Sequence, residues 1–141
     1  QVMNPEASRF LDLIYENWTG RGMQTLTSAL QRRHGLGSEW SRFFVEYPMV
    51  VGPIFTQPPF EVGYDIAGKA EAWDTLVQLR LTVAANILSL PAAAVPTGIG
   101  ADGLPRGVQV IGARFRDDLC LEGAQAIEDA LGTFTPIDPR A

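Results

Sequence analysis

The sequence has 141 residues, of which 46% are hydrophobic and 19% charged, and this composition excludes a disordered or membrane-embedded chain. Its net charge of −5, with arginines that are scattered apart from the doublet Arg32–Arg33, argues against a nucleic-acid surface. A single cysteine excludes an internal disulfide and supports no metal motif. Without a recognisable signal peptide or a run of about 18 apolar residues, the expectation is a cytoplasmic protein with no membrane partner.

Residues 1–47 are predicted to form a helical segment. Asn4–Pro5 supplies a helix cap followed by proline at the first helical position. Apolar residues then recur at helical spacing, and Gly20, Gly35 and Pro48 act as stops. The pattern predicts three helices, at about residues 5–20, 23–33 and 39–47.

Residues 48–141 are predicted to combine strands with helices. In chain order we expect a buried strand at 49–55, an extended loop at 57–60, a long amphipathic helix at 65–90, two antiparallel strands around 92–95 and 108–111, and a helix from Asp117 or Asp118 to Gly132. Gly68 is a point at which the long helix can break. Gln109, the one polar residue in the last strand, is expected to fix backbone more than substrate. The fold class is α/β, with several helices packed on a small mixed sheet.

The segment Gly98–Gly103 matches the dinucleotide-binding pattern G-x-G-x-x-G. Such a loop must open a helix whose amides meet the pyrophosphate. Here Leu104–Pro105 follows at once, and residues 108–111 alternate as a strand. We therefore interpret the glycines as a tight connection between two antiparallel strands rather than as a nucleotide site.

Two phrases carry a family resemblance: Asn86–Gly98, which reads NILSLPAAAVPTG, and Gly103–Gly112, which reads GLPRGVQVIG. Both resemble the C-terminal region of the amidase signature family, serine hydrolases that cut carboxamide C–N bonds. The likeness covers roughly residues 45–140 and includes the closing phrase Thr135–Pro139. It implies that residues 1–141 are a single C-terminal fragment of an amidase domain, with a helical segment at 1–47 and a mixed-sheet and helix segment at 48–141.

The resemblance also implies where the catalytic groups are. Family members use a serine, a second serine preceded by a cis peptide bond, and a lysine, and the two serines belong to a Gly/Ser-rich segment upstream of the region matched here. The serines of this chain are isolated from any such segment, and Lys69 is its only lysine. We therefore expect no catalytic residue, no metal and no cofactor in this chain, and a small-molecule amide as the substrate of the whole enzyme.

Three residues before Asn86 are expected to bind substrate, because in the family the residues one and two turns before this asparagine face the pocket. By position these are Leu79, Thr82 and Ala85, and ordinary helix packing is the alternative for each. Members that take ammonia from glutamine for tRNA-dependent amidation place an acidic residue near position 79. Leucine cannot supply that charge, which favours a hydrolase of a small or partly apolar carboxamide.

Two alternatives stay open. One is a subunit of a glutamine-dependent tRNA amidotransferase, and the other is a non-catalytic interaction module. In isolation, uncovered strand edges and an apolar face are expected to make the chain self-associate.

Overall fold

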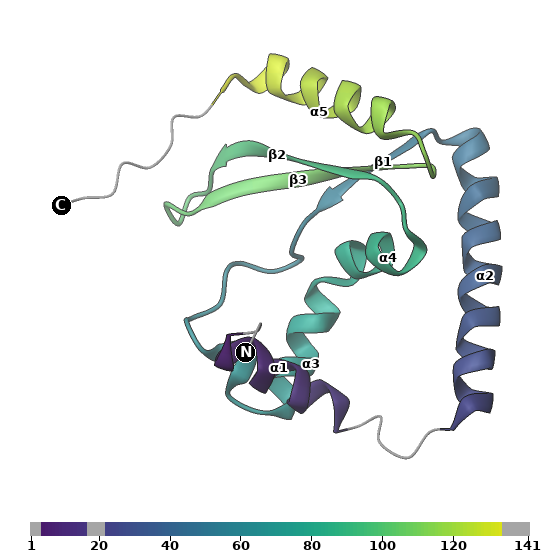
Figure 1. The fold of residues 1–141 in the computed structure, drawn as a ribbon. Helices are drawn as coiled ribbons and strands as arrows, with labels where there is room; N and C mark the ends of the chain where they lie inside the picture. The colour runs from purple at the N-terminus through teal and green to yellow at the C-terminus, as the bar shows by residue number, and fades with distance from the viewer. Residues whose placement is uncertain (1–3, 17–21, 134–141) are drawn as a thin grey trace.

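The computed structural model describes residues 4–16 and 22–133, and it confirms the α/β class. Helices surround a small sheet, with α5 on one side of the strands and α4 on the other (Figure 1). The helices are α1 (Pro5–Tyr15), α2 (Met23–Glu46), α3 (Lys69–Gln78), α4 (Arg80–Leu88) and α5 (Asp117–Leu131), with a short 3-10 helix η1 (Tyr64–Ile66). The strands are β1 (Met49–Pro53), β2 (Ala92–Ile99) and β3 (Pro105–Gly112).

The sheet has the order β1-β3-β2, and both of its pairings are antiparallel. The expected hairpin between the last two strands is therefore present, and among the described residues the sheet contains no parallel pair. Because side chains alternate along a strand, the neighbours Val110 and Ile111 of the central strand point to opposite faces. Both are fully buried: Val110 lies close to Gly123 of α5, and Ile111 packs with Phe44 and Ala85. β3 is thus covered on both faces.

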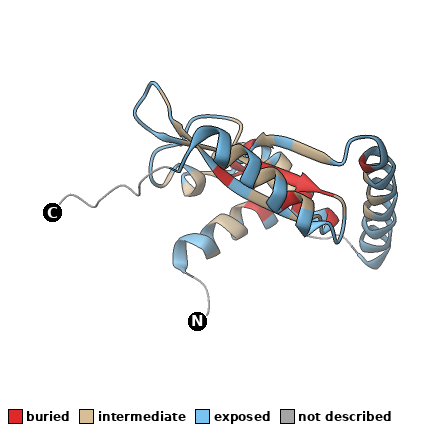
Figure 2. Cartoon of the chain, turned by 90° about the horizontal axis from the view of Figure 1, so that it is seen from above, coloured by how far each residue is buried: buried red, intermediate tan, exposed pale blue. Residues whose placement is uncertain are grey.

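α2 is one continuous helix, so the predicted interruption near Gly35 is wrong. Glycine inside a helix costs about 1 kcal/mol relative to alanine, a cost that packing can offset. Here the second half of α2 packs against the core through Phe44 and Trp40. The first half is largely exposed, with Met23 at 75% and Leu26 at 53%, and Figure 2 shows α2 mostly in the pale blue of exposed residues. Tertiary contact at one end of the helix therefore outweighs the local helix-breaking tendency of Gly35.

The helix predicted from Asp65 to Leu90 is three pieces, η1, α3 and α4. The break at Gly68 is confirmed, since this residue has an extended backbone and precedes α3. A second break at Leu79 was not predicted. Its cause lies outside the helix: the carbonyl of Gln78 accepts hydrogen bonds from the backbone N–H of Thr56, at 3.1 Å, and from its hydroxyl, at 3.2 Å. The loop that contains Thr56 therefore occupies a helix carbonyl at this turn with hydrogen bonds from outside the helix.

The ends of the outer helices agree in part with the prediction. Asn4 caps α1, its side-chain oxygen accepting from the N–H of Glu6 at 2.8 Å. α5 ends at Gly132, as predicted. Its N-terminal cap position is occupied by Arg116 and not by Asp117 or Asp118, so that part of the prediction is wrong. The predicted stop of the first helix at Gly20 and the phrase Thr135–Pro139 lie outside the described residues. Within the described ranges, no helix combines the length and apolarity that a membrane crossing requires.

Candidate functional site

A small polar network links β1, β3 and α4 below the sheet. Gln109, which is only 4% exposed, donates through Nε2 to the carbonyl oxygen of Pro53 at 3.0 Å and to the hydroxyl of Thr82 at 3.2 Å. Thr82 in turn donates to the carbonyl oxygen of Ile54 at 3.1 Å. The buried amide donor is thereby satisfied, as buried polar groups must be. The network fixes the point at which the chain leaves β1 relative to α4.

The loop after β1 is also held against α3. The Thr56 hydroxyl lies 2.5 Å from the side-chain oxygen of Gln78, whose Nε2 donates to Asp74 at 3.0 Å. Tyr64 donates its hydroxyl to the other oxygen of Asp74 at 3.2 Å. Two effects raise the pKa of Tyr64: partial desolvation is the larger, and the hydrogen bond to the Asp74 carboxylate is the second. Tyr64 therefore stays a hydrogen-bond donor at neutral pH and helps to fix the loop.

Rings on this loop form a short aromatic row. The ring centroids of Phe55 and Phe60 are 5.6 Å apart, and those of Phe60 and Tyr64 are 5.5 Å apart. Both spacings fall in the range in which aromatic pairs attract each other. An open cleft of about 650 Å³ runs between residues 54–60 of this loop and residues 105–107 at the start of β3. Its size suits a small organic ligand.

One cation lies at the rim of the cleft. Arg106 forms an ion pair with Asp102 at 2.5 Å, and both side chains are more than one-third exposed. A hydrogen bond from the backbone N–H of Leu104, together with Arg106, lowers the pKa of Asp102. The carboxylate therefore stays ionised at neutral pH and balances the guanidinium charge, which leaves the cleft without a net charge at this rim.

The three residues predicted to bind substrate lie in different surroundings. Thr82 is half-buried and belongs to the polar network, one hydrogen bond away from the cleft residue Ile54. Leu79 is half-buried at the α3–α4 junction. Ala85 is 6% exposed and packs with Phe44 in the core. None of the three lines the 650 Å³ cleft in the described structure, so their contact with substrate stays a prediction.

Sequence reasoning missed part of this arrangement. Gln109 does fix backbone as predicted, through Pro53, but its second bond to Thr82 was not anticipated. The two residues are 27 positions apart, and a single sequence contains no signal for such a pairing. The only hint was a lone glutamine in an otherwise apolar strand.

The described residues contain no serine–lysine pair. The hydroxyls of Ser28, Ser38 and Ser41 donate to carbonyls four residues earlier in α2. Lys69 is paired with Glu16 at the surface. Among the described residues there is also no group of three or more histidine, cysteine, aspartate or glutamate side chains that could hold a metal ion.

Comparison with known proteins identifies relatives over most of the chain. The family model described as Amidase matches residues 4–121. Indoleacetamide hydrolase of Bradyrhizobium japonicum is 38% identical over 110 residues, which are 75% of this chain and 23% of that protein. A glutamyl-tRNA(Gln) amidotransferase subunit of Lactobacillus gasseri is 33% identical over 100 residues, which are 71% of this chain and 20% of that protein.

Solved structures show the same likeness. The structure of 6-aminohexanoate cyclic dimer hydrolase superposes with a TM-score of 0.70 and 26% identity, over 78% of this chain and 25% of that one. A glutamyl-tRNA(Gln) amidotransferase subunit of Thermotoga maritima gives a TM-score of 0.61 at 25% identity, over 89% of this chain and 33% of that one. The chain thus spans only a fifth to a third of the length of these relatives.

Proposed function

This chain belongs to the amidase family, and on that premise we propose that it forms the C-terminal part of an enzyme that hydrolyses the C–N bond of a small carboxamide. The match of the family model over residues 4–121 supports amidase-type chemistry in general. The finer proposal is that a Ser-cisSer-Lys set lies upstream of this chain, as the family resemblance implies, and it is compatible with a chain that spans only about a quarter of the length of these relatives.

The proposed reaction is acyl transfer at the amide carbonyl. The serine supplied by the upstream part attacks the carbonyl carbon, the serine–lysine pair moves the proton to the leaving nitrogen, and backbone amides hold the oxyanion. Water then releases the acid. This chain contributes one wall of the substrate site and no catalytic group.

The observation that carries this role is the polar network of Gln109, Thr82 and Ile54. It keeps the loop after β1 in a fixed position beside α4, through bonds of 3.1 and 3.2 Å. Fixed positioning of substrate-binding walls contributes to rate, because a misplaced substrate reacts more slowly. We propose that Leu79, Thr82 and Ala85 present the helix face along which the substrate lies.

The second candidate is a subunit of a tRNA-dependent amidotransferase. Its support is the 33% identity to the Lactobacillus gasseri protein. Against it, Leu79 offers no charge for an ammonium group, and an apolar side chain there suits a neutral or partly apolar amide better. A non-catalytic interaction module is the third candidate. An assay of amide hydrolysis separates it from both enzymes, because such a module releases no ammonia.

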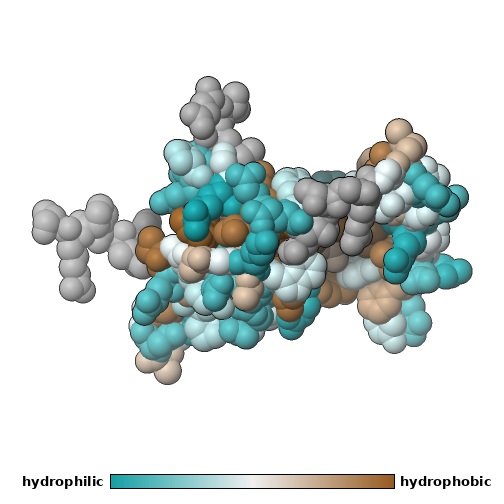
Figure 3. All heavy atoms as spheres, turned by 90° about the horizontal axis from the view of Figure 1, so that it is seen from below, coloured by the Kyte–Doolittle hydropathy of each residue, from teal (hydrophilic) through white to brown (hydrophobic). Residues whose placement is uncertain are grey.

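Self-association of the isolated chain belongs to the same proposal. Large apolar side chains are exposed on several elements, among them Val45 at 87% and Ile99 at 71%. Figure 3 shows hydrophobic side chains reaching the surface on the lower side of the molecule. β1 and β2 also form the two edges of the three-stranded sheet. Such surfaces favour association, either with the remainder of an amidase or with a second copy. The expected cytoplasmic location stays a prediction.

The experiment joins this chain to the polypeptide encoded upstream of it and measures ammonia release from a panel of primary amides. We expect hydrolysis by the joined protein and none by the 141-residue chain alone. Thr82→Val should lower kcat/KM by about tenfold, equivalent to about 1.4 kcal/mol, because the loop loses its hydroxyl contacts. Thr27→Val is the matched control, since the hydroxyl of Thr27 contacts only a carbonyl within α2.

Three results would oppose the proposal. Activity in the short chain alone would contradict the upstream location of the catalytic groups. A joined protein that releases no ammonia from any amide would favour the interaction module. Activity confined to glutamine in the presence of a charged tRNA would favour the amidotransferase.

A further inference from the structure

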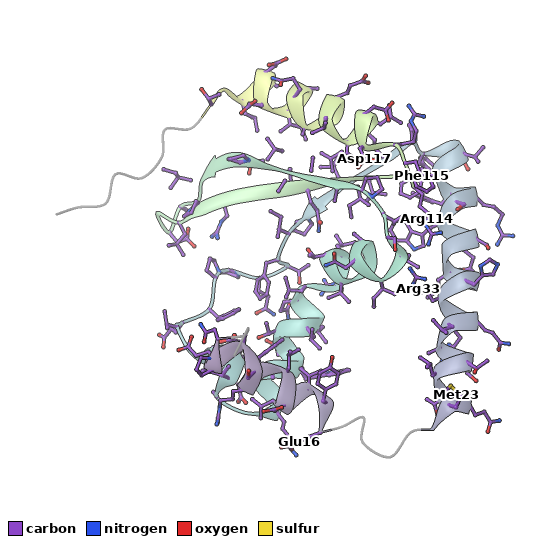
Figure 4. The ribbon with its side chains drawn as sticks, viewed as in Figure 1. Glu16, Met23, Arg33, Arg114, Phe115 and Asp117 are labelled. Carbon is purple, nitrogen blue, oxygen red and sulfur yellow. The ribbon has the colours of Figure 1, made fainter. Side chains whose placement is uncertain are left out.

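Two arginines from different elements meet at the C-terminal end of α4 (Figure 4). Arg33 of α2 donates through Nε to the carbonyl oxygen of Ile87 and through Nη2 to the hydroxyl of Ser89, at 2.9 Å. Arg114, in the turn after β3, donates to the carbonyl oxygen of Leu88 through Nε at 3.0 Å and through Nη2 at 2.7 Å. We refer to Arg33 and Arg114 as the arginine pair.

The arginine pair has no acidic partner among the described residues. The ion pairs found there are Lys69 with Glu16, Arg106 with Asp102, and Arg116 with Asp118. The carbonyl end of α4 faces the pair, but a helix terminus compensates only about half of one charge. Both positive side chains line the same pocket, in a chain whose net charge is −5.

Capping the helix leaves much of the donor capacity of the pair unused. A guanidinium carries five N–H groups. Arg33 and Arg114 each use two of them in the bonds above, which leaves three on each side chain. These donors have a fixed planar geometry that matches the oxygens of phosphate or carboxylate.

A polar pocket of about 230 Å³ opens next to the arginine pair, between α2 and Arg114. Gly37 leaves this space free, because a side chain placed there would begin 3.9 Å from Nη2 of Arg114. His34 also lines the pocket, as do Ser38 and Ser41, whose hydroxyls donate to helix carbonyls. Leu30 is the one large apolar residue of the lining.

We propose that this pocket binds a small oxyanion of the phosphate class. The anion accepts hydrogen bonds from the unused N–H groups of Arg33 and Arg114, and it neutralises two guanidinium charges that form no ion pair among the described residues. Charge-assisted bonds of this kind are about twice as strong as bonds between neutral groups. The site is separate from the cleft beside the aromatic row, and the inference does not depend on amidase activity.

The test titrates the 141-residue chain with inorganic phosphate at constant ionic strength and follows backbone amide shifts by NMR. We expect saturable shifts at Gly37, Ser38 and Arg114, and none when sodium chloride replaces phosphate. Arg33→Gln and Arg114→Gln should each weaken phosphate binding by at least about tenfold, or about 1.4 kcal/mol.

Two further variants separate binding from folding and from general charge. Gly37→Leu fills the pocket while both arginines stay in place, and leucine favours a helix more than glycine does. It should abolish the shifts and keep the helical circular dichroism signal. Arg80→Gln is the charge-matched control, because Arg80 also donates to a helix carbonyl, that of Val77 at 3.1 Å, but lies outside the pocket. It should leave phosphate binding unchanged.

Several outcomes would overturn the proposal. Shifts that rise linearly without saturating would show that no site exists. An equal loss of binding in Arg80→Gln would reduce the effect to net charge. Undiminished binding in a folded Gly37→Leu variant would place the phosphate elsewhere on the chain.

Discussion

Removal of the Thr82 hydroxyl is the sharpest test of the polar network. Thr82→Val keeps the shape of the side chain but loses the bond to Ile54 and the bond from Gln109, at 3.1 and 3.2 Å. Each bond stabilises the folded chain by about 1 kcal/mol, so the variant should be less stable by about 2 kcal/mol. Thr27→Val, in which an exposed hydroxyl bonded to the carbonyl of Met23 is lost, should change stability by less than about 0.5 kcal/mol.

A double-mutant cycle isolates the bond between the two side chains. Gln109→Met removes the bonds to Pro53 and to Thr82, and should also cost about 2 kcal/mol. Because one bond is common to both variants, the double variant loses three bonds and should cost about 3 kcal/mol. The coupling energy is then about 1 kcal/mol.

Urea unfolding followed by circular dichroism measures these differences. With a slope of about 2 kcal/mol per molar urea, a loss of about 2 kcal/mol lowers the midpoint by about 1 M. The slope itself should stay constant, since the folded surface does not change. Strictly additive losses, or a Thr82→Val midpoint equal to that of Thr27→Val, would refute the network as described.

Three further outcomes are expected. Gly35→Ala should stabilise the chain by about 1 kcal/mol in urea unfolding, and Gly103→Ala should destabilise it by about the same amount. Both sites have open space for a side chain, but only Gly103 has a positive φ, of 77°. Equal shifts of the urea midpoint in the two variants would contradict this. Burial raises the pKa of Cys120 above its unfolded value, so its contribution to stability is complete below about pH 8.5 and is lost as the pH rises through the folded pKa. The free energy of unfolding between about pH 7 and 10 checks it, and a rise with pH for wild type relative to Cys120→Ala would oppose the assignment. Lys69→Met should change the urea midpoint little, because its pair with Glu16 is more than half exposed, and a loss above about 1 kcal/mol would assign the lysine a larger role.

The sequence predicted local structure well where local chemistry decides it. The cap at Asn4, the break at Gly68 and the stop at Gly132 each depend on a few neighbouring residues, and all three are present. The hairpin of β2 and β3 followed from turn residues between two apolar stretches.

The errors arose where distant contacts decide the structure. α2 continues through Gly35 because its second half packs against the core, and α3 ends at Gln78 because Thr56 binds its carbonyl. The bond between Thr82 and Gln109 is of the same kind. Family resemblance pointed to Thr82 as a position of interest, but its partners Ile54 and Gln109 lie 28 and 27 positions away, and only the folded chain brings them together.

The arginine pair has a consequence for the order of folding events. The contacts of Arg33 and Arg114 with the end of α4 join residues 54 and 26 positions apart in the chain. Closing such long loops costs entropy, so local hairpins and helices form first and contacts of this range form late. Substitution of Arg33 should accordingly accelerate unfolding in stopped-flow kinetics and leave the refolding rate nearly unchanged. The last turn of α4 would then be among the final parts of the chain to become rigid.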